Sequence, residues 1–132
     1  MSKALFVTGT GTDVGKTYVT ALLVKKLQET GKTNAYYKAA MSGNEQGPDG
    51  ALLPGDALFV KNTAGLSQPA DTMCPYVYRQ AVSPHLAARL EGGPVDPAAV
   101  QAGFQMVCAD YDFVTVEGSG GILCPLRWDE QH

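Results

Sequence analysis

The sequence predicts an α/β fold in which a parallel sheet is flanked by helices. Short apolar stretches indicate strands at residues 4–8, 34–38 and 112–118. Between the first two, apolar side chains recur at helical spacing. A strand, a crossover helix and a further strand form a right-handed parallel unit, so the sheet is expected to be parallel.

The first strand runs into a glycine-rich turn and then a helix, over residues 6–17. Glycines let successive backbone N–H groups face an anion, and the helix N-terminus adds partial positive charge. Lys16 is placed to reach the β- and γ-phosphates, and the Thr17 hydroxyl to ligate Mg²⁺. The standard motif has a glycine where this chain has Thr10. The alternative is a simple connecting turn, but Gly-Lys-Thr after an apolar strand favours a nucleotide site and a P-loop NTPase-like sheet.

The composition is that of one globular domain, which we assign to residues 1–132. Hydrophobic residues make up 45% of the chain and charged residues 17%, which is enough apolar material for a core. The net charge is −3 and Lys and Arg do not cluster, which argues against a nucleic-acid partner. No apolar run reaches the roughly 18 residues of a membrane span.

The N-terminus and the cysteines indicate a cytoplasmic protein. Residues 1–3 lead straight into the first strand, which leaves no room for a signal peptide. Cys74, Cys108 and Cys124 are widely spaced and form no CxxC pair. We therefore expect reduced thiols that act as small apolar residues.

The helix after the glycine-rich turn is predicted from Lys16 to about Thr30, with Gly31 as its stop. Helical spacing predicts one apolar face made of Val19, Leu22, Leu23 and Leu27.

Lys38 ends the second strand. The carboxyl edge of an open α/β sheet is where ligands bind, so Lys38 is a candidate for ligand contact. The alternative is a solvated lysine at a strand end.

Residues 39–55 form a long loop rich in glycine and proline, and loops of this length are usually functional or mobile. Asp56 follows, directly before the apolar residues 57–60. It is placed either as the N-cap of a short helix or as a metal or nucleotide contact. Further on, residues 72–78 predict a short edge strand, because Pro75 excludes a central one.

Two helices are predicted between this edge strand and the last strand. Ser83 as N-cap and Pro84 at the first helical position begin one, with His85 in a capping or packing role. Asp96 and the proline after it begin the other in the same way. Its apolar side chains follow helical spacing at Val100, Phe104, Val107 and Cys108.

The third strand ends in Glu117, followed by glycines and Ser119. An acid at a strand tip downstream of a phosphate loop often holds Mg²⁺, directly or through water. The alternative is an ordinary solvent-facing glutamate. Three good strands are few for a doubly wound nucleotide-binding sheet, so we expect the domain to lack its C-terminal strands.

Taken together, these motifs resemble the dethiobiotin synthetase family over residues 3–126. The resemblance rests on Val7–Thr17 with threonine at position 10, Tyr37-Lys38 followed by Ser42-Gly43, Gly55–Leu58, Ser83–Leu86 and Val116–Gly121. The chain departs from the family in having Ala39 where a proline usually follows the lysine, and in being shorter. It is similar to the front half or so of such an enzyme.

The resemblance implies an ATP- and Mg²⁺-dependent ligase of biotin synthesis. The family joins CO₂ to 7,8-diaminononanoate (7,8-diaminopelargonate) and closes a cyclic urea, giving dethiobiotin, ADP and phosphate. An amine first takes up CO₂ as a carbamate, whose oxygen attacks the γ-phosphate. The second amine then attacks the activated carbonyl and releases phosphate. The substrates are small molecules, and the family acts as a homodimer.

The resemblance also assigns roles to residues. Lys38 and Lys16 would be catalytic, supplying fixed positive charge between two anions. Thr17, Asp56 and Glu117 match the family's metal positions, and Ser42 matches a substrate-contacting serine. The nucleotide-binding positions are Thr12, Asp13, Val14, Gly15, Lys16, Thr17, Tyr18, Asp56, Glu117, Gly118, Ser119 and Gly120.

Two alternatives stay open at this point. The chain belongs either to the diamine ligases or to a related P-loop ATPase or amidotransferring synthetase. Partition-type loops carry an extra lysine near the loop start, which this chain lacks. The second alternative is an inactive nucleotide-binding fragment, whose uncovered sheet edge would favour association or poor solubility.

Overall fold

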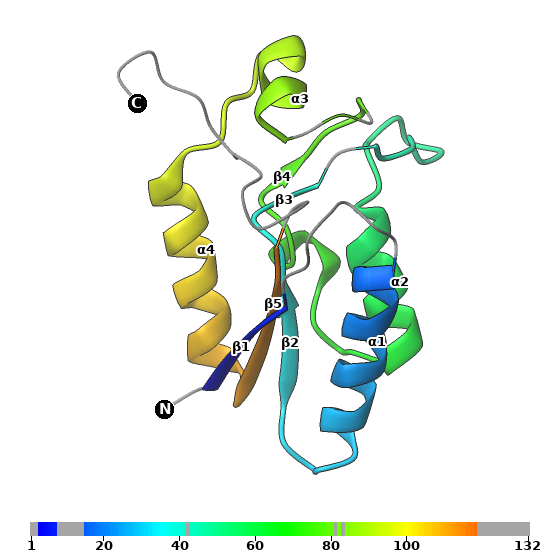
Figure 1. Cartoon of the computed structure of the whole chain (residues 1–132), viewed down its shortest axis with the longest axis vertical. Helices are drawn as coiled ribbons and strands as arrows, with labels where there is room; N and C mark the ends of the chain where they lie inside the picture. Colours follow the sequence, from blue (N-terminus) through cyan, green and yellow to red (C-terminus); the bar gives the residue numbers. More distant parts are fainter. Residues whose placement is uncertain (1–2, 8–14, 42, 81, 83, 119–132) are drawn as a thin grey trace.

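The computed structural model describes residues 3–7, 15–41, 43–80, 82 and 84–118. Its main sheet has three parallel strands in the order β1 (Lys3–Val7), β5 (Phe113–Glu117) and β2 (Asn34–Tyr37). Helices α1 (Gly15–Gln28) and α2 (Gly55–Ala64) lie on one side of it, and α4 (Pro97–Asp110) lies on the other (Figure 1). The predicted parallel sheet flanked by helices is confirmed.

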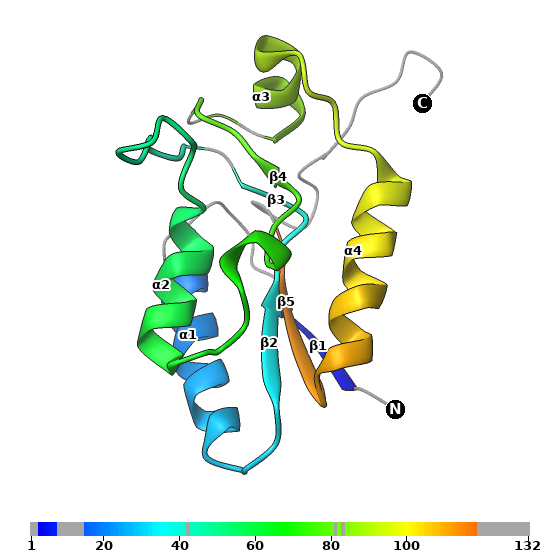
Figure 2. The same ribbon diagram turned by 180° about the vertical axis from the view of Figure 1, so that it is seen from behind.

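A second, two-stranded parallel sheet continues beyond the end of β2. It pairs β3 (Ala40–Met41) with β4 (Tyr76–Val77). The 3₁₀ turn η1 (Ala70–Thr72) precedes β4, and α3 (Pro84–Glu91) lies beyond it (Figure 2). β4 begins directly after Pro75, so a short strand is present within the predicted stretch 72–78.

The strand register brings the carboxyl ends of the main sheet to one level. Glu117, the last residue of β5, lies opposite Val7, the last residue of β1. On the other side, Val116 lies opposite Tyr37, the last residue of β2. The residues that end β5 and follow β2 are therefore neighbours at one edge, which positions the candidate site.

The core on the α1 and α2 side differs from the predicted apolar face of α1. The buried residues of α1 are Thr20, Ala21 and Val24, whereas Val19 and Leu22 are 56% and 45% exposed. The helical spacing of apolar residues predicts that they share one face of the helix, but it does not show whether that face packs against the sheet or faces solvent. Small side chains let α1 approach α2 and β2 closely, and Ala21 and Val24 share a cluster with Tyr36. The prediction for Val19 and Leu22 is wrong.

The helix caps agree with the sequence at one helix and differ at another. At α4, Asp96 is the N-cap, and its Oδ1 accepts a hydrogen bond from the Ala98 N–H at 3.0 Å. At α2, the N-cap residue is Pro54 and the helix begins at Gly55, so Asp56 lies in the first turn. The prediction of Asp56 as N-cap is wrong, while α3 begins at Pro84 as predicted.

Apolar side chains are exposed on β1. Leu5 is 41% exposed and Phe6 is 67% exposed. Within the described part of the chain, β1 pairs only with β5.

Candidate functional site

Lys38 lies between two carboxylates at the carboxyl ends of the strands. Its Nζ donates to Glu117 Oε2 at 2.7 Å and to Asp56 Oδ2 at 2.7 Å. The Lys38 side chain is 9% exposed and that of Glu117 is 0% exposed, whereas that of Asp56 is 43% exposed. The site therefore opens to solvent on the Asp56 side and is closed beneath Glu117.

Thr17 completes this group from the first turn of α1. Its Oγ1 donates to the same Glu117 Oε2, at 3.2 Å. The residues are separated by 100 positions, and the contact brings the N-terminus of α1 to the end of β5. A helix N-terminus beside a fixed lysine is suited to binding an anion such as a phosphate.

The electrostatics of the group favour a charged Lys38. Burial alone would lower the pKa of Lys38, but attraction to Glu117 and Asp56, together with hydrogen bonds to both, raises it. The ammonium group therefore carries its charge at neutral pH. Removing the carboxylate of Glu117 or Asp56 would leave the buried charge of Lys38 less compensated, which would lower the free energy of unfolding.

Asn44 fixes the start of α2 and so the position of Asp56. Its Oδ1 accepts from the Gly55 N–H at 3.0 Å, and its Nδ2 donates to the carbonyls of Met41 and Tyr78. The N-cap residue Pro54 makes no side-chain hydrogen bond to the first N–H groups of α2. The side chain of Asn44 provides the acceptor instead. The sequence pattern does not predict this role of Asn44, because the residue lies in a glycine-rich stretch that is typical of turns.

Tyr36 lies beneath the site on the same side of the sheet as α1 and α2. Its side chain is fully buried, and its pKa is raised well above the usual value, first by burial and then by the charges of Glu117 and Asp56. A hydrogen-bonding contribution from Glu117 raises the Tyr36 pKa further, but no hydrogen bond of good geometry joins the Tyr36 hydroxyl or Glu117 Oε1 to another described atom. Glu117 therefore retains a buried oxygen that could accept a further ligand.

The donor set fits Mg²⁺. Thr17, Asp56 and Glu117 offer a hydroxyl and two carboxylates, and hard cations prefer such oxygen ligands. In the described part of the chain, no three His, Cys, Asp or Glu side chains gather in one place. The candidate metal ligands therefore consist of two acids and a hydroxyl, with Lys38 between the acids.

Other predicted site residues are only partly described. Lys16 is half-buried in the first turn of α1, and Tyr18 is 57% exposed beside Phe59, with ring centroids 6.5 Å apart. A Cβ at Gly118 would lie 3.4 Å from the Phe6 ring, so this glycine also permits packing against β1. Several predicted residues lie outside the described residues: Thr12, Asp13, Val14, Ser42, Ser119 and Gly120.

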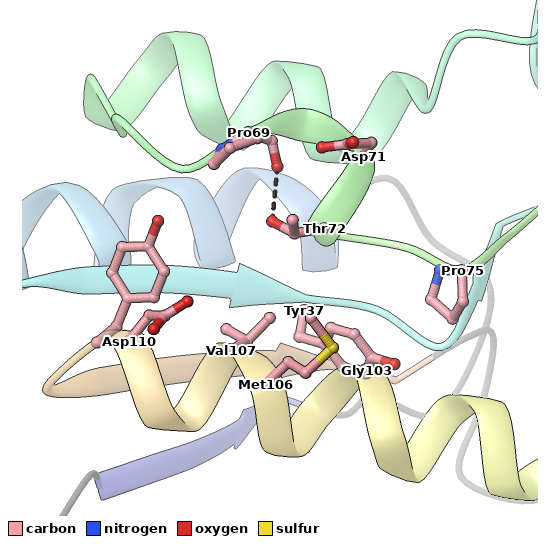
Figure 3. Close-up of a pocket in the computed structure, with 10 residues that line it drawn as sticks. Tyr37, Pro69, Asp71, Thr72, Pro75, Gly103, Met106, Val107 and Asp110 are labelled. Atoms are coloured by element: carbon pink, nitrogen blue, oxygen red, sulfur yellow. Dashed lines mark hydrogen bonds between the residues drawn. The ribbon is translucent and has the colours of Figure 1, made fainter.

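A separate cavity of about 270 Å³ lies on the α4 side of the sheet. Figure 3 shows its lining: Tyr37 of β2, Thr72 of η1 and residues of α4 that include Met106. The Tyr37 hydroxyl is engaged with the Val100 carbonyl at 2.7 Å, and the Thr72 hydroxyl donates to Pro69. None of the site residues described above lines this cavity.

No helix among the described residues has the length and apolar character needed to cross a lipid bilayer.

Comparison with curated proteins finds relatives named ATP-dependent dethiobiotin synthetase BioD. The protein from Clostridium botulinum (strain ATCC 19397 / Type A) is 48% identical over 126 residues, which cover 96% of this chain and 55% of the relative. The protein from Brachyspira hyodysenteriae is 45% identical over 129 residues, covering 98% of this chain and 56% of the relative.

The chain spans about half the length of the curated relatives it matches. This agrees with the expected similarity to roughly half of such an enzyme. The AAA domain family matches residues 3–130, nearly the whole chain. The chain therefore belongs to the AAA domain family.

Proposed function

We propose that this chain forms the ATP- and Mg²⁺-binding part of a dethiobiotin synthetase. The enzyme would convert 7,8-diaminononanoate, CO₂ and ATP into dethiobiotin, ADP and phosphate. The observation that carries the proposal is Lys38, held at 2.7 Å from both Asp56 and Glu117 beside the N-terminus of α1. The names of the relatives, which are 45–48% identical over nearly the whole chain, support this reaction among those of related ATPases.

The arrangement suits a reaction between two anions. A carbamate and a γ-phosphate repel each other, so fixed positive charge must hold them together. Lys38 from the end of β2 and Lys16 from the start of α1 would supply that charge. The buried surroundings of Lys38 strengthen its interaction with an anion relative to water. The N–H groups at the start of α1 would bind the phosphates.

Thr17, Asp56 and Glu117 would hold Mg²⁺. When bound, the metal would neutralise charge on the phosphates during transfer. The predicted contacts of Thr12, Asp13, Val14, Gly15, Tyr18, Gly118, Ser119 and Gly120 with nucleotide, and of Ser42 with the diamine, are part of the same proposal. A cytoplasmic homodimer is likewise proposed, and sedimentation of the purified protein tests the dimer.

The decisive experiment measures phosphate release by the purified chain with ATP and Mg²⁺. It is run with and without the diamine plus bicarbonate, beside a curated relative as positive control. Release that depends on the diamine and bicarbonate would support the ligase. Release that ignores both would favour a different ATPase. ATP binding without release, beside an active relative, would favour a nucleotide-binding piece that is not itself a catalyst.

A further inference from the structure

We infer that Lys38 is an internal counter-ion that a divalent cation displaces, so that loading of the metal releases the lysine for substrate. This inference rests on the proposed metal site and adds an order of events to it. In the structure, Lys38 Nζ lies 2.7 Å from one oxygen of Glu117 and 2.7 Å from one oxygen of Asp56. It therefore occupies the position between the two carboxylates.

The same carboxylate oxygen cannot serve both cations well. Glu117 Oε2 already accepts from Lys38 at 2.7 Å and from Thr17 at 3.2 Å. A metal ligated by Thr17 and Glu117 would place a second positive charge close to the ammonium group. In surroundings where Glu117 is 0% exposed and Lys38 is 9% exposed, such repulsion is weakly screened.

The chain lets the side chain move while the backbone stays fixed. The Lys38 backbone N–H donates to the Met73 carbonyl at 2.8 Å, which anchors the residue beside β2. The lysine side chain is a flexible stem with a compact charge at its end. Asp56, on the exposed side of the site, is 43% exposed, so a path toward solvent exists there. Displacement requires rotamer changes and no change of fold.

The consequence is an ordered response to metal. Without a divalent cation, Lys38 compensates Asp56 and Glu117 and is withheld from other anions. With the cation bound, the carboxylates are compensated by the metal and the ammonium group is free to contact an anionic substrate. The competing arrangement keeps Lys38 on Glu117 Oε2 while the metal takes the other, buried oxygen, Oε1.

Amine labelling of the wild-type chain separates these arrangements without a substitution. The chain is treated briefly with a small amine-reactive reagent, with and without MgCl₂ at constant ionic strength, and the labelled lysines are identified by mass spectrometry. Lys38 should react slowly without Mg²⁺ and several-fold faster with it. Lys32, which is exposed, serves as the internal control and should not change. Unchanged Lys38 labelling at saturating Mg²⁺ overturns the inference and leaves the metal site standing.

A titration of Mg²⁺ by calorimetry gives the second measurement. Lys38→Met removes the competing charge, so it should bind Mg²⁺ about tenfold more tightly or better. Lys32→Met, away from the site, should bind as the wild type does. Displacement is supported if Lys38→Met binds Mg²⁺ more tightly than both the wild type and Lys32→Met. It is also supported if Lys38→Met is the only one of the three proteins that binds Mg²⁺. Equal affinity of both variants overturns displacement, and absence of Mg²⁺ binding in all three proteins overturns the metal site as well.

Discussion

The side-chain amide of Gln68 hydrogen-bonds both backbone groups of Tyr36. Its Oε1 accepts from the Tyr36 N–H at 2.8 Å, and its Nε2 donates to the Tyr36 carbonyl at 3.1 Å. Tyr36 belongs to β2, an edge strand of the main sheet as described. Gln68 is fully buried, and its amide satisfies the groups that a neighbouring strand would otherwise pair.

Replacing Gln68 should therefore destabilise the fold strongly. In Gln68→Leu the side chain keeps its bulk but leaves two buried backbone groups of Tyr36 without partners. Each unsatisfied group costs about 1–3 kcal/mol of unfolding free energy. Urea denaturation measures the loss. Gln101→Leu, at an exposed position of α4, is the matched control and should change stability little. Equal effects of the two substitutions would contradict the role of Gln68.

Gly103 on α4 should not tolerate a methyl group. A Cβ at this position would lie 2.8 Å from the Tyr37 hydroxyl, which is itself held by the Val100 carbonyl at 2.7 Å. Gly103→Ala must therefore displace the Tyr37 ring or its hydrogen bond. Overpacking of this kind costs about 1–3 kcal/mol, which offsets the gain in helix propensity of about 1 kcal/mol. Thermal or urea denaturation measures the net change.

A double-mutant cycle isolates this contact. Tyr37→Phe removes the hydroxyl, and the nearest remaining ring atoms lie 3.5 Å from the added Cβ, an ordinary contact distance. In the Tyr37→Phe background, Gly103→Ala should therefore stabilise the helix by up to about 1 kcal/mol. The same destabilisation in both backgrounds would show that the hydroxyl is not the cause.

Stability should fall as the pH rises above about 9, and Cys74 should cause the first part of the loss. Burial raises the pKa of the Cys74 thiol from 9.0 to about 12. Because the unfolded chain then releases this proton more readily than the folded chain, rising pH favours unfolding. The contribution of Cys74 is complete below pH 9 and is lost by about pH 12. Denaturant midpoints measured from pH 7 to 10 test this.

Substitution of Cys74 assigns the effect. Cys74→Ala should flatten the fall in stability between pH 9 and 10. Burial also raises the pKa values of Tyr37 and Tyr78 to about 12, but their loss begins only near pH 10. A slope between pH 9 and 10 that survives Cys74→Ala would assign the effect to another group.

Lys38→Ala should abolish diamine-dependent phosphate release and leave ATP binding largely intact. The first expectation follows because the substitution removes a fixed positive charge between two anions. The second follows because the N-terminus of α1 keeps its N–H groups. Coupled release assays and nucleotide titrations measure both, with Lys32→Ala as the control lysine. Normal turnover in Lys38→Ala would remove the catalytic assignment.

The strands and their order along the chain could be predicted because apolar runs and turn residues are local signals. The placement of Lys38 and Glu117 also followed, since strand ends of a parallel sheet meet at one edge. Their direct contact at 2.7 Å did not follow, because it depends on the register of two strands whose residues are 79 positions apart. In general, the hydrophobic pattern on the two faces of a sheet specifies the register, and that pattern is not read from one strand alone.

The supporting residues of the site could not be predicted for a related reason. Asn44 and Gln68 act through buried side-chain amides on distant backbone groups, at Gly55 and Tyr36. In sequence, both lie in stretches that are typical of surface loops. Asp56 illustrates the same limit. Its position before an apolar run is typical of a cap, but the Asn44 contact starts α2 at Gly55 and leaves Asp56 to pair with Lys38.

The exposed edge at β1 should make the chain associate with itself. Phe6 is 67% exposed on a strand that pairs only with β5 among the described strands. An apolar edge strand offers both unpaired backbone groups and apolar surface to another chain. We therefore expect the average mass in sedimentation experiments to rise with protein concentration.

Substitution of Phe6 distinguishes association through the edge of β1 from nonspecific association through exposed apolar surface. Phe6→Lys places a charge on the edge and should shift the chain toward monomer, because natural edge strands use lysine to prevent pairing. Met106→Lys is the matched control, since Met106 is 69% exposed but lies on α4. If both substitutions reduce the mass equally, association depends on apolar surface in general. If only Phe6→Lys does so, the contact is formed by β1. The proposed homodimer would then either bury β1 in its interface or form in competition with association through β1.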